Sequence, residues 1–183
     1  MIRLAGRLAL LAAFLAGAPA AVAQALATEP AVKAALLYKF ASYVEWPAEV
    51  AGGPAAPFVF GVMGADDVAA ELEQLVAGRA VNGHPASVRR VREGEALNGL
   101  HVLFVGAPEA GRIRAAAAAA RPRSVLVVSS TSGGLEAGSV INFVPADDRV
   151  GFEVSVDAAE RSALKVSSRM LGVAKRVVSA SPS

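Results

Sequence analysis

The stretch INFVPADDRVGFEVSVDAAERSALKVSSRMLGVAKRV, residues 141–177, carries the most specific folding pattern of the chain. Apolar residues alternate at strand spacing on both sides of residues 146–148, whose short side chains favour a tight turn. Asp157 and Glu160 then have the spacing of a capping box, and the apolar residues after them follow helical spacing to about residue 177. We therefore predict a β-hairpin followed by one capped, amphipathic helix.

The rest of the chain predicts alternating helices and strands. Two continuous apolar runs, residues 101–105 and 125–129, are typical of strands that are covered on both faces. Asn82-Gly83 predicts a tight hairpin turn, and the adjacent Arg89 and Arg90 favour an edge position for the strand that follows. Helices are expected over residues 29–44, 66–77 and 108–120, and strands over 58–63, 86–91, 101–105 and 125–129. This order predicts an α/β fold of three layers, in which a single mixed β-sheet has helices on both faces and ends in a C-terminal β-hairpin plus helix.

The first 23 residues have the pattern of a cleavable signal peptide. Arg3 and Arg7 begin the chain, an uncharged apolar stretch follows, and residues 21–23 read Ala-Val-Ala, a small-residue cleavage signal. A membrane anchor is the alternative, but it needs about 20 apolar residues, and Gly17 and Pro19 end this run early. We expect cleavage after Ala23, or after residue 25, which leaves one periplasmic domain over residues 24–178 and a flexible tail over 179–183.

Charge and cysteine content exclude several classes of function. The chain has 18 basic and 16 acidic residues, and residues 1–23 hold two of the bases and none of the acids, so the exported part has 18 − 2 = 16 of each. Such a balance lacks the net positive charge on which sequence-independent nucleic-acid binding depends. The absence of cysteine excludes disulfides, thiolate catalysis and cysteine-ligated metals.

No group of residues in the sequence has the spacing of a catalytic or metal site. His84 and His101 are the only histidines, and neither has a ligand partner at helical spacing. Carboxylate pairs occur at an expected helix cap and at the hairpin turn, where structural roles are ordinary. Residues 129–134, Ser-Ser-Thr-Ser-Gly-Gly, follow an apolar strand and resemble an anion-binding loop without the lysine of a nucleotide site. We expect no enzyme, no cofactor and no metal, while a small-ligand pocket at the strand ends stays open.

Much of the aromatic content gathers between residues 38 and 46. Tyr43, Glu45 and Trp46 lie near the expected end of the first helix. Their position is consistent with a contact site and equally with a lid over the core.

The same region belongs to a larger resemblance. Residues 33–47, KAALLYKFASYVEWP, together with residues 81–85, 101–105, 141–143, 149–153 and 164–168, occur in the order of the YfiR family of exported bacterial proteins. The resemblance implies a periplasmic regulator without enzymatic activity. Its best-known type represses an inner-membrane diguanylate cyclase, which lowers cyclic di-GMP, and is itself sequestered by a peptidoglycan-associated outer-membrane protein. Members of that type carry disulfides, so redox control of that kind is absent here.

Polar residues inside these motifs are the candidates for a partner or ligand surface: Tyr43, Glu45, Trp46, Arg149, Glu153, Lys165 and Arg169. The expected function is control, by repression, of an inner-membrane signalling enzyme, either a diguanylate cyclase or a histidine kinase. Alternatives are a periplasmic small-ligand receptor that serves a membrane histidine kinase or a transport system, and a hydrolase whose site is assembled across the fold. An outer-membrane partner and a homodimer are further possibilities.

Overall fold

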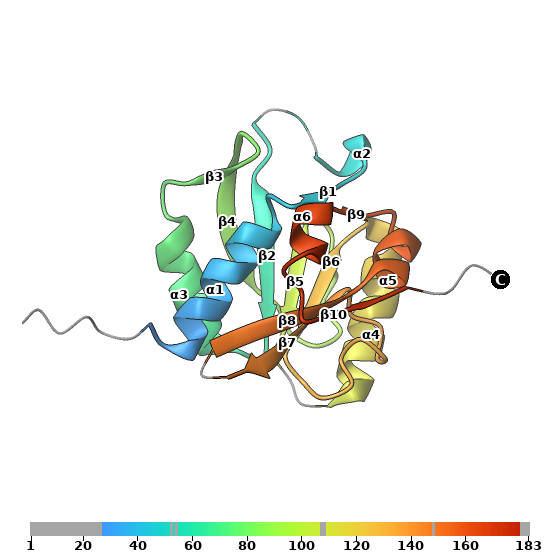
Figure 1. The fold of residues 1–183 in the computed structure, drawn as a ribbon. Helices are drawn as coiled ribbons and strands as arrows, with labels where there is room; N and C mark the ends of the chain where they lie inside the picture. Colours follow the sequence, from blue (N-terminus) through green and yellow to red (C-terminus); the bar gives the residue numbers. More distant parts are fainter. Residues whose placement is uncertain (1–26, 52, 54, 107–108, 148, 180–183) are drawn as a thin grey trace, which may run out of the picture.

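An eight-stranded mixed sheet forms the middle layer of the protein (Figure 1). The computed structural model describes residues 27–51, 53, 55–106, 109–147 and 149–179. The strand order is β10-β8-β7-β6-β5-β2-β4-β3, in which the pairs β7–β8 and β3–β4 are antiparallel and the other pairs are parallel. A separate two-stranded ribbon pairs β1 with β9. The predicted fold class is confirmed, with this ribbon as an addition.

The elements follow the predicted alternation closely in the first two thirds of the chain. The strands are β1 (Val44–Glu45), β2 (Phe58–Met63), β3 (Ala80–Val81), β4 (His84–Arg90), β5 (Val102–Val105), β6 (Leu126–Ser129), β7 (Ile141–Ala146), β8 (Arg149–Ser155), β9 (Lys165–Val166) and β10 (Arg176–Val178). The helices are α1 (Glu29–Phe40), α2 (Ala48–Ala51), α3 (Asp66–Val76), α4 (Ala110–Ala120), α5 (Val156–Arg161) and α6 (Ser168–Leu171), and residues Arg121–Arg123 form a 3-10 turn.

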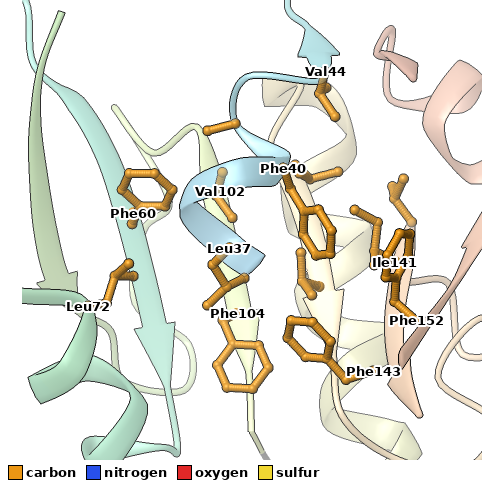
Figure 2. Close-up of a cluster of buried hydrophobic side chains, with 14 of the residues drawn as sticks. Leu37, Phe40, Val44, Phe60, Leu72, Val102, Phe104, Ile141, Phe143 and Phe152 are labelled. Atoms are coloured by element: carbon orange, nitrogen blue, oxygen red, sulfur yellow. The ribbon is translucent and has the colours of Figure 1, made fainter. Parts of the chain in front are cut away.

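Two hydrophobic cores lie on opposite faces of the sheet. The larger core packs α1, α3, α5 and α6 against one face, and α4 covers the other. In the larger core, Phe40 lies 4.9 Å from Phe152 and 5.8 Å from Phe143, measured between ring centroids (Figure 2). Phe40 is 2% exposed, so its ring fixes α1 over the hairpin strands.

The predicted hairpin is present. β7 and β8 pair from Ile141 with Val154 to Ala146 with Arg149, and Asp147 adopts a φ of 51° in the turn. The Asn82-Gly83 turn between β3 and β4 is confirmed as well, with both residues at positive φ. Only the first two residues of β7 pair with β6, so the hairpin continues past the end of that parallel strand.

The predicted single helix over residues 157–177 is wrong. The chain instead forms α5, β9, α6 and β10 in succession, and the cap of α5 is Ser155, whose side chain accepts from Ala158 N, rather than Asp157. Ala163 has a φ of 54°, which a continuing helix does not allow. Lys165 and the next residue then pair with β1, because tertiary strand pairing overrides the local helical pattern.

The first helix ends earlier than expected, at Phe40 rather than Val44, because Val44 joins β1. Some predicted features lie outside the described residues. They are the signal peptide with its cleavage site, Pro108 at the expected start of a helix, Asp148 in the hairpin turn, and residues 180–183 of the predicted tail.

Candidate functional site

A row of four polar side chains crosses four neighbouring strands at one level of the sheet. Strand register places Ser129 of β6 beside Asn142 of β7, Asn142 beside Glu153 of β8, and Glu153 beside Arg176 of β10. We call these four residues the polar row. Side chains at registered positions share one face of a sheet, so the row forms because each strand contributes a polar residue at the same position.

Hydrogen bonds connect the polar row from end to end. Ser129 Oγ donates to Asn142 Oδ1 at 2.7 Å, Asn142 Nδ2 donates to Glu153 Oε1 at 3.0 Å, and Arg176 Nε donates to Glu153 Oε2 at 2.7 Å. Ser129 is also 2.8 Å from the buried Ser139 Oγ. Ser129, Asn142 and Glu153 are buried, and burial without partners would be costly.

Asn142 also fixes the loop that follows β6. Its Oδ1 accepts from Thr131 N at 3.1 Å, and its Nδ2 donates to Thr131 O at 2.9 Å, so one amide holds both backbone groups of Thr131. Gly134 passes directly over the row, where an added Cβ would overlap Ser129 and Asn142. The loop over residues 130–134 is therefore held in place by the sheet beneath it.

At its outer end the polar row becomes a charged cluster. Arg176 also donates to Glu136 Oε1 at 3.2 Å. A hydrogen bond from its own backbone N–H, together with the one from Arg176, holds the pKa of Glu136 below its ordinary value. Hydrogen bonds to Glu153 and Glu136 raise the pKa of Arg176. Both shifts favour the charged forms of Glu136 and Arg176.

An open groove of about 940 Å³ begins at this cluster. We call it the hairpin groove, because it follows the β7–β8 hairpin and reaches the N-terminal turns of α1. Its described lining consists of Ala27, Glu29, Val32, Lys33, Ser130, Thr131, Ser132, Gly133, Glu136, Asn142, Phe143, Val144, Pro145, Asp147, Arg149, Val150, Glu153 and Arg176. Lys33 pairs with Glu29 at 2.6 Å, whereas Arg149 is exposed and forms no ion pair with a described residue.

A second surface lies at the other end of α1, where the β1–β9 ribbon meets α6 (Figure 1). We call it the ribbon corner and define it by Tyr43, Glu45, Trp46, Lys165 and Arg169. Glu45 and Lys165 are registered partners across the ribbon, and Tyr43 is 41% exposed. Tyr43 O accepts from Ser167 N at 2.9 Å, which ties the start of α6 to the ribbon.

A pocket of about 250 Å³ opens beside this corner. We call it the aromatic pocket; its described lining is Val44, Glu45, Trp46, Phe58, Asn82, His84 and His101. The Trp46 and Phe58 rings meet edge to face with centroids 5.2 Å apart, and Phe58 stacks on His101 at 4.4 Å. Trp46 Nε1 donates to His101 O at 3.3 Å, so the pocket wall is anchored to the start of β5.

His101 is a fixed, neutral side chain of this wall. Its Nδ1 accepts from Val59 N at 3.2 Å, so the proton of the neutral ring is on Nε2. Burial lowers the pKa of His101, the nearby His84 lowers it further, and a backbone hydrogen bond with Val50 opposes part of this effect.

Residues 30–175 match the family model described as YfiR/HmsC-like. The chain belongs to the YfiR/HmsC-like family. The match covers almost all of the described domain, from the first turn of α1 to the residue before β10. No curated protein matches the chain at a significant level. The expected resemblance is therefore confirmed at the level of the family.

The seven residues predicted for a partner or ligand surface fall into two groups in this YfiR/HmsC-like fold. Tyr43, Glu45, Trp46, Lys165 and Arg169 come together at the ribbon corner, and Arg149 and Glu153 line the hairpin groove. Their role stays a prediction in both places. Glu153 is only 8% exposed, so it reaches the groove as part of the polar row.

Several residues of both sites were not singled out in the sequence. Asn142 had a usable signal, since the predicted hairpin turn places it opposite Glu153. Arg176 had none, because its strand was expected to be helix. Phe58 and His101 are distant from Trp46 in the sequence, and the tertiary structure brings their rings together.

Two further features bear on the expected chemistry. Within the described residues, no three His, Asp or Glu side chains gather as metal ligands would. Across the same ranges, none of the helices has both the length and the apolar character that crossing a bilayer requires.

Proposed function

We propose that the protein is a periplasmic regulator that represses an inner-membrane signalling enzyme, such as a diguanylate cyclase, and thereby lowers cyclic di-GMP. The family match over residues 30–175 is the observation that carries this proposal. Regulation of this kind requires a surface that binds two states of the enzyme with different affinity, and it requires no nucleophile.

The arrangement of the two surfaces supports such a role. The ribbon corner and the hairpin groove lie at opposite ends of α1, a helix of 12 residues, which is about 18 Å long at 1.5 Å per residue. One surface can therefore contact the sensor domain of the membrane enzyme while the other stays open to a second protein. A peptidoglycan-associated outer-membrane protein and a second copy of this chain are the partners proposed for that position.

Cyclic di-GMP measured in cells tests the proposal. Expression of the full chain in a deletion strain should lower cyclic di-GMP, and a chain that lacks residues 1–23 should not, because it stays in the cytoplasm. Trp46→Ala combined with Arg149→Ala should relieve repression, while Arg114→Ala, an exposed residue of α4 outside both surfaces, should not. Unchanged cyclic di-GMP on deletion and re-expression would contradict the proposed function. Full repression by the folded double variant would contradict the proposal that the ribbon corner and the hairpin groove are the binding surfaces.

A second candidate is a periplasmic small-ligand receptor that serves a membrane histidine kinase or a transport system. The hairpin groove favours it, since about 940 Å³ lies within the range of ligand sites, and its lining includes the loop after β6 that Asn142 holds in place. Heating the purified protein with metabolite mixtures separates the two candidates. A ligand raises the melting temperature through linkage, whereas a regulator that binds only proteins melts unchanged.

A further inference from the structure

The aromatic pocket has the chemistry of a cation site. Its described lining includes the rings of Trp46, Phe58, His84 and His101, one carboxylate, Glu45, and neither lysine nor arginine. Faces of aromatic rings attract organic cations, with tryptophan as the strongest of them. A pocket with these walls and one negative group at its edge disfavours anions and favours positive charge.

Each of the two histidines in the lining is held by a hydrogen bond to the backbone, which fixes the position of one ring proton. His101 accepts a hydrogen bond from Val59 N at Nδ1, and burial lowers its pKa, so the ring adds no positive charge. His84 Nδ1 lies 2.9 Å from Ala56 O, and a carbonyl can only accept, so Nδ1 carries the proton and Nε2 is the acceptor of the neutral ring. The His101 ring therefore presents neutral imidazole to the pocket, and the His84 ring is held in place by its bond to Ala56 O.

The pocket also has a carboxylate that no described side chain neutralises. Glu45 is exposed and takes part in no described ion pair. Lys165 is its registered partner on β9, yet the two charged groups form no described ion pair. Lys165 does not line the pocket, so it is a cation outside the pocket that competes with a ligand for Glu45.

We propose that the aromatic pocket binds small organic ammonium ions, with the positive group against the half-buried Trp46 and its charge balanced by Glu45. A volume of about 250 Å³ suits a compact head group of this kind rather than a nucleotide-sized ligand. The inference does not depend on the proposed regulatory function. It would place a chemical input directly beside the ribbon corner, since Glu45 and Trp46 belong to both.

The chain contains a reporter for this site, because Trp46 is its only tryptophan. Choline and tetramethylammonium are the probes, and 3,3-dimethylbutanol is the uncharged match of choline. At constant ionic strength, the ammonium ions should change Trp46 fluorescence saturably at millimolar concentrations, and the alcohol should not. Ligand-observed NMR on the same samples detects binding that leaves the fluorescence unchanged.

Two charge variants make the test specific. Glu45→Gln should weaken choline binding about fivefold, the change that loss of a partly exposed charge pair gives. Lys165→Gln should tighten it, because the rival cation is removed, and Glu160→Gln, an exposed carboxylate of α5 outside the pocket, should leave it unchanged.

Three outcomes would overturn the inference. These are the absence of binding in both measurements, equal binding of choline and the alcohol, and equal losses in the Glu45 and Glu160 variants. None of them bears on cyclic di-GMP in cells, so failure of this inference is distinguishable from failure of the regulatory proposal.

Discussion

Replacing Gly134 by alanine should destabilise the protein strongly, although it adds a single methyl group. An ideal Cβ at this position would overlap Ser129 Oγ and Asn142 Oδ1 and would lie 2.6 Å from Asn142 Cγ. Both side chains are buried and hydrogen-bonded to each other at 2.7 Å. They cannot retreat without breaking the polar row, so the loop over residues 130–134 must move instead.

The expected cost follows from two effects. Overpacking of a well-filled site costs about 1–3 kcal/mol. A buried polar group that loses its partner costs about 1–3 kcal/mol more, and the bonds between Asn142 and Thr131 are the ones that a displaced loop breaks first. We expect Gly134→Ala to lower the free energy of unfolding by about 3 kcal/mol, which lies within the combined range of about 2–6 kcal/mol.

Urea unfolding followed by circular dichroism measures this change. With a slope of about 2 kcal/mol per molar urea, the midpoint should fall by about 1.5 M. Gly111→Ala is the matched control, because a Cβ there meets nothing within 4 Å and the residue lies inside α4. That variant should be at least as stable as the unmodified protein, with a gain below the roughly 0.5–1 kcal/mol of a mid-helix glycine, because Gly111 lies in the first turn of α4. A Gly134→Ala midpoint within 0.3 M of the unmodified protein would refute the packing described for the polar row, since that shift is about 0.6 kcal/mol.

Three more predictions concern the core, the histidine and the charged cluster. Phe40→Ala should cost about 3–5 kcal/mol in urea unfolding, as expected for an aromatic core residue, and a loss below 1 kcal/mol would contradict its buried position. Stability should decline as the pH falls below about 6.5, because the folded-state pKa of His101 is lowered and the unfolded chain takes up the proton first. His101→Asn should reduce that decline between pH 8 and pH 5, and an unchanged slope would assign it to other groups. Arg176→Ala should lower the urea midpoint by leaving Glu153 Oε2 unpaired, and adding Glu153→Gln should recover part of the loss; no recovery would contradict the pairing.

The elements predicted best from the sequence are those in which local pattern and tertiary pairing agree. Phe58–Met63 occurs as predicted, and the hairpin turn lies where short polar residues interrupt two alternating runs. In both cases the side-chain period matches the strand that the sheet requires. Elements can be predicted from one sequence when their local pattern and their tertiary pairing favour the same structure.

The C-terminal region shows the opposite case. Residues after Leu164 have helical spacing, yet Lys165–Val166 and Arg176–Val178 are strands because β1 and β8 offer them partners. Those partners lie far away in the sequence, so no local window contains the information. The same holds for the aromatic pocket, where Trp46 meets His101 only after β5 is placed.

The candidate surfaces were predictable in part for the same reason. Motif residues such as Glu45 and Lys165 were selected separately, and the ribbon brings them together. The sequence alone does not indicate the polar row, because Arg176 falls in a predicted helix and Asn142 has the pattern of an ordinary strand residue. Counting residues outward from the predicted hairpin turn pairs Asn142 with Glu153, as the structure shows.

The β1–β9 ribbon joins residues from the two extremes of the domain, since Val44 pairs with Val166. β10, the last strand within the described residues, likewise forms one edge of the sheet. Loop closure over such distances makes these contacts slow to form during folding. The chain therefore cannot complete its native topology while its C-terminus is still being synthesised or threaded. Until then, the partner position beside β1 and the sheet edge formed by β8 stay open in a newly made molecule.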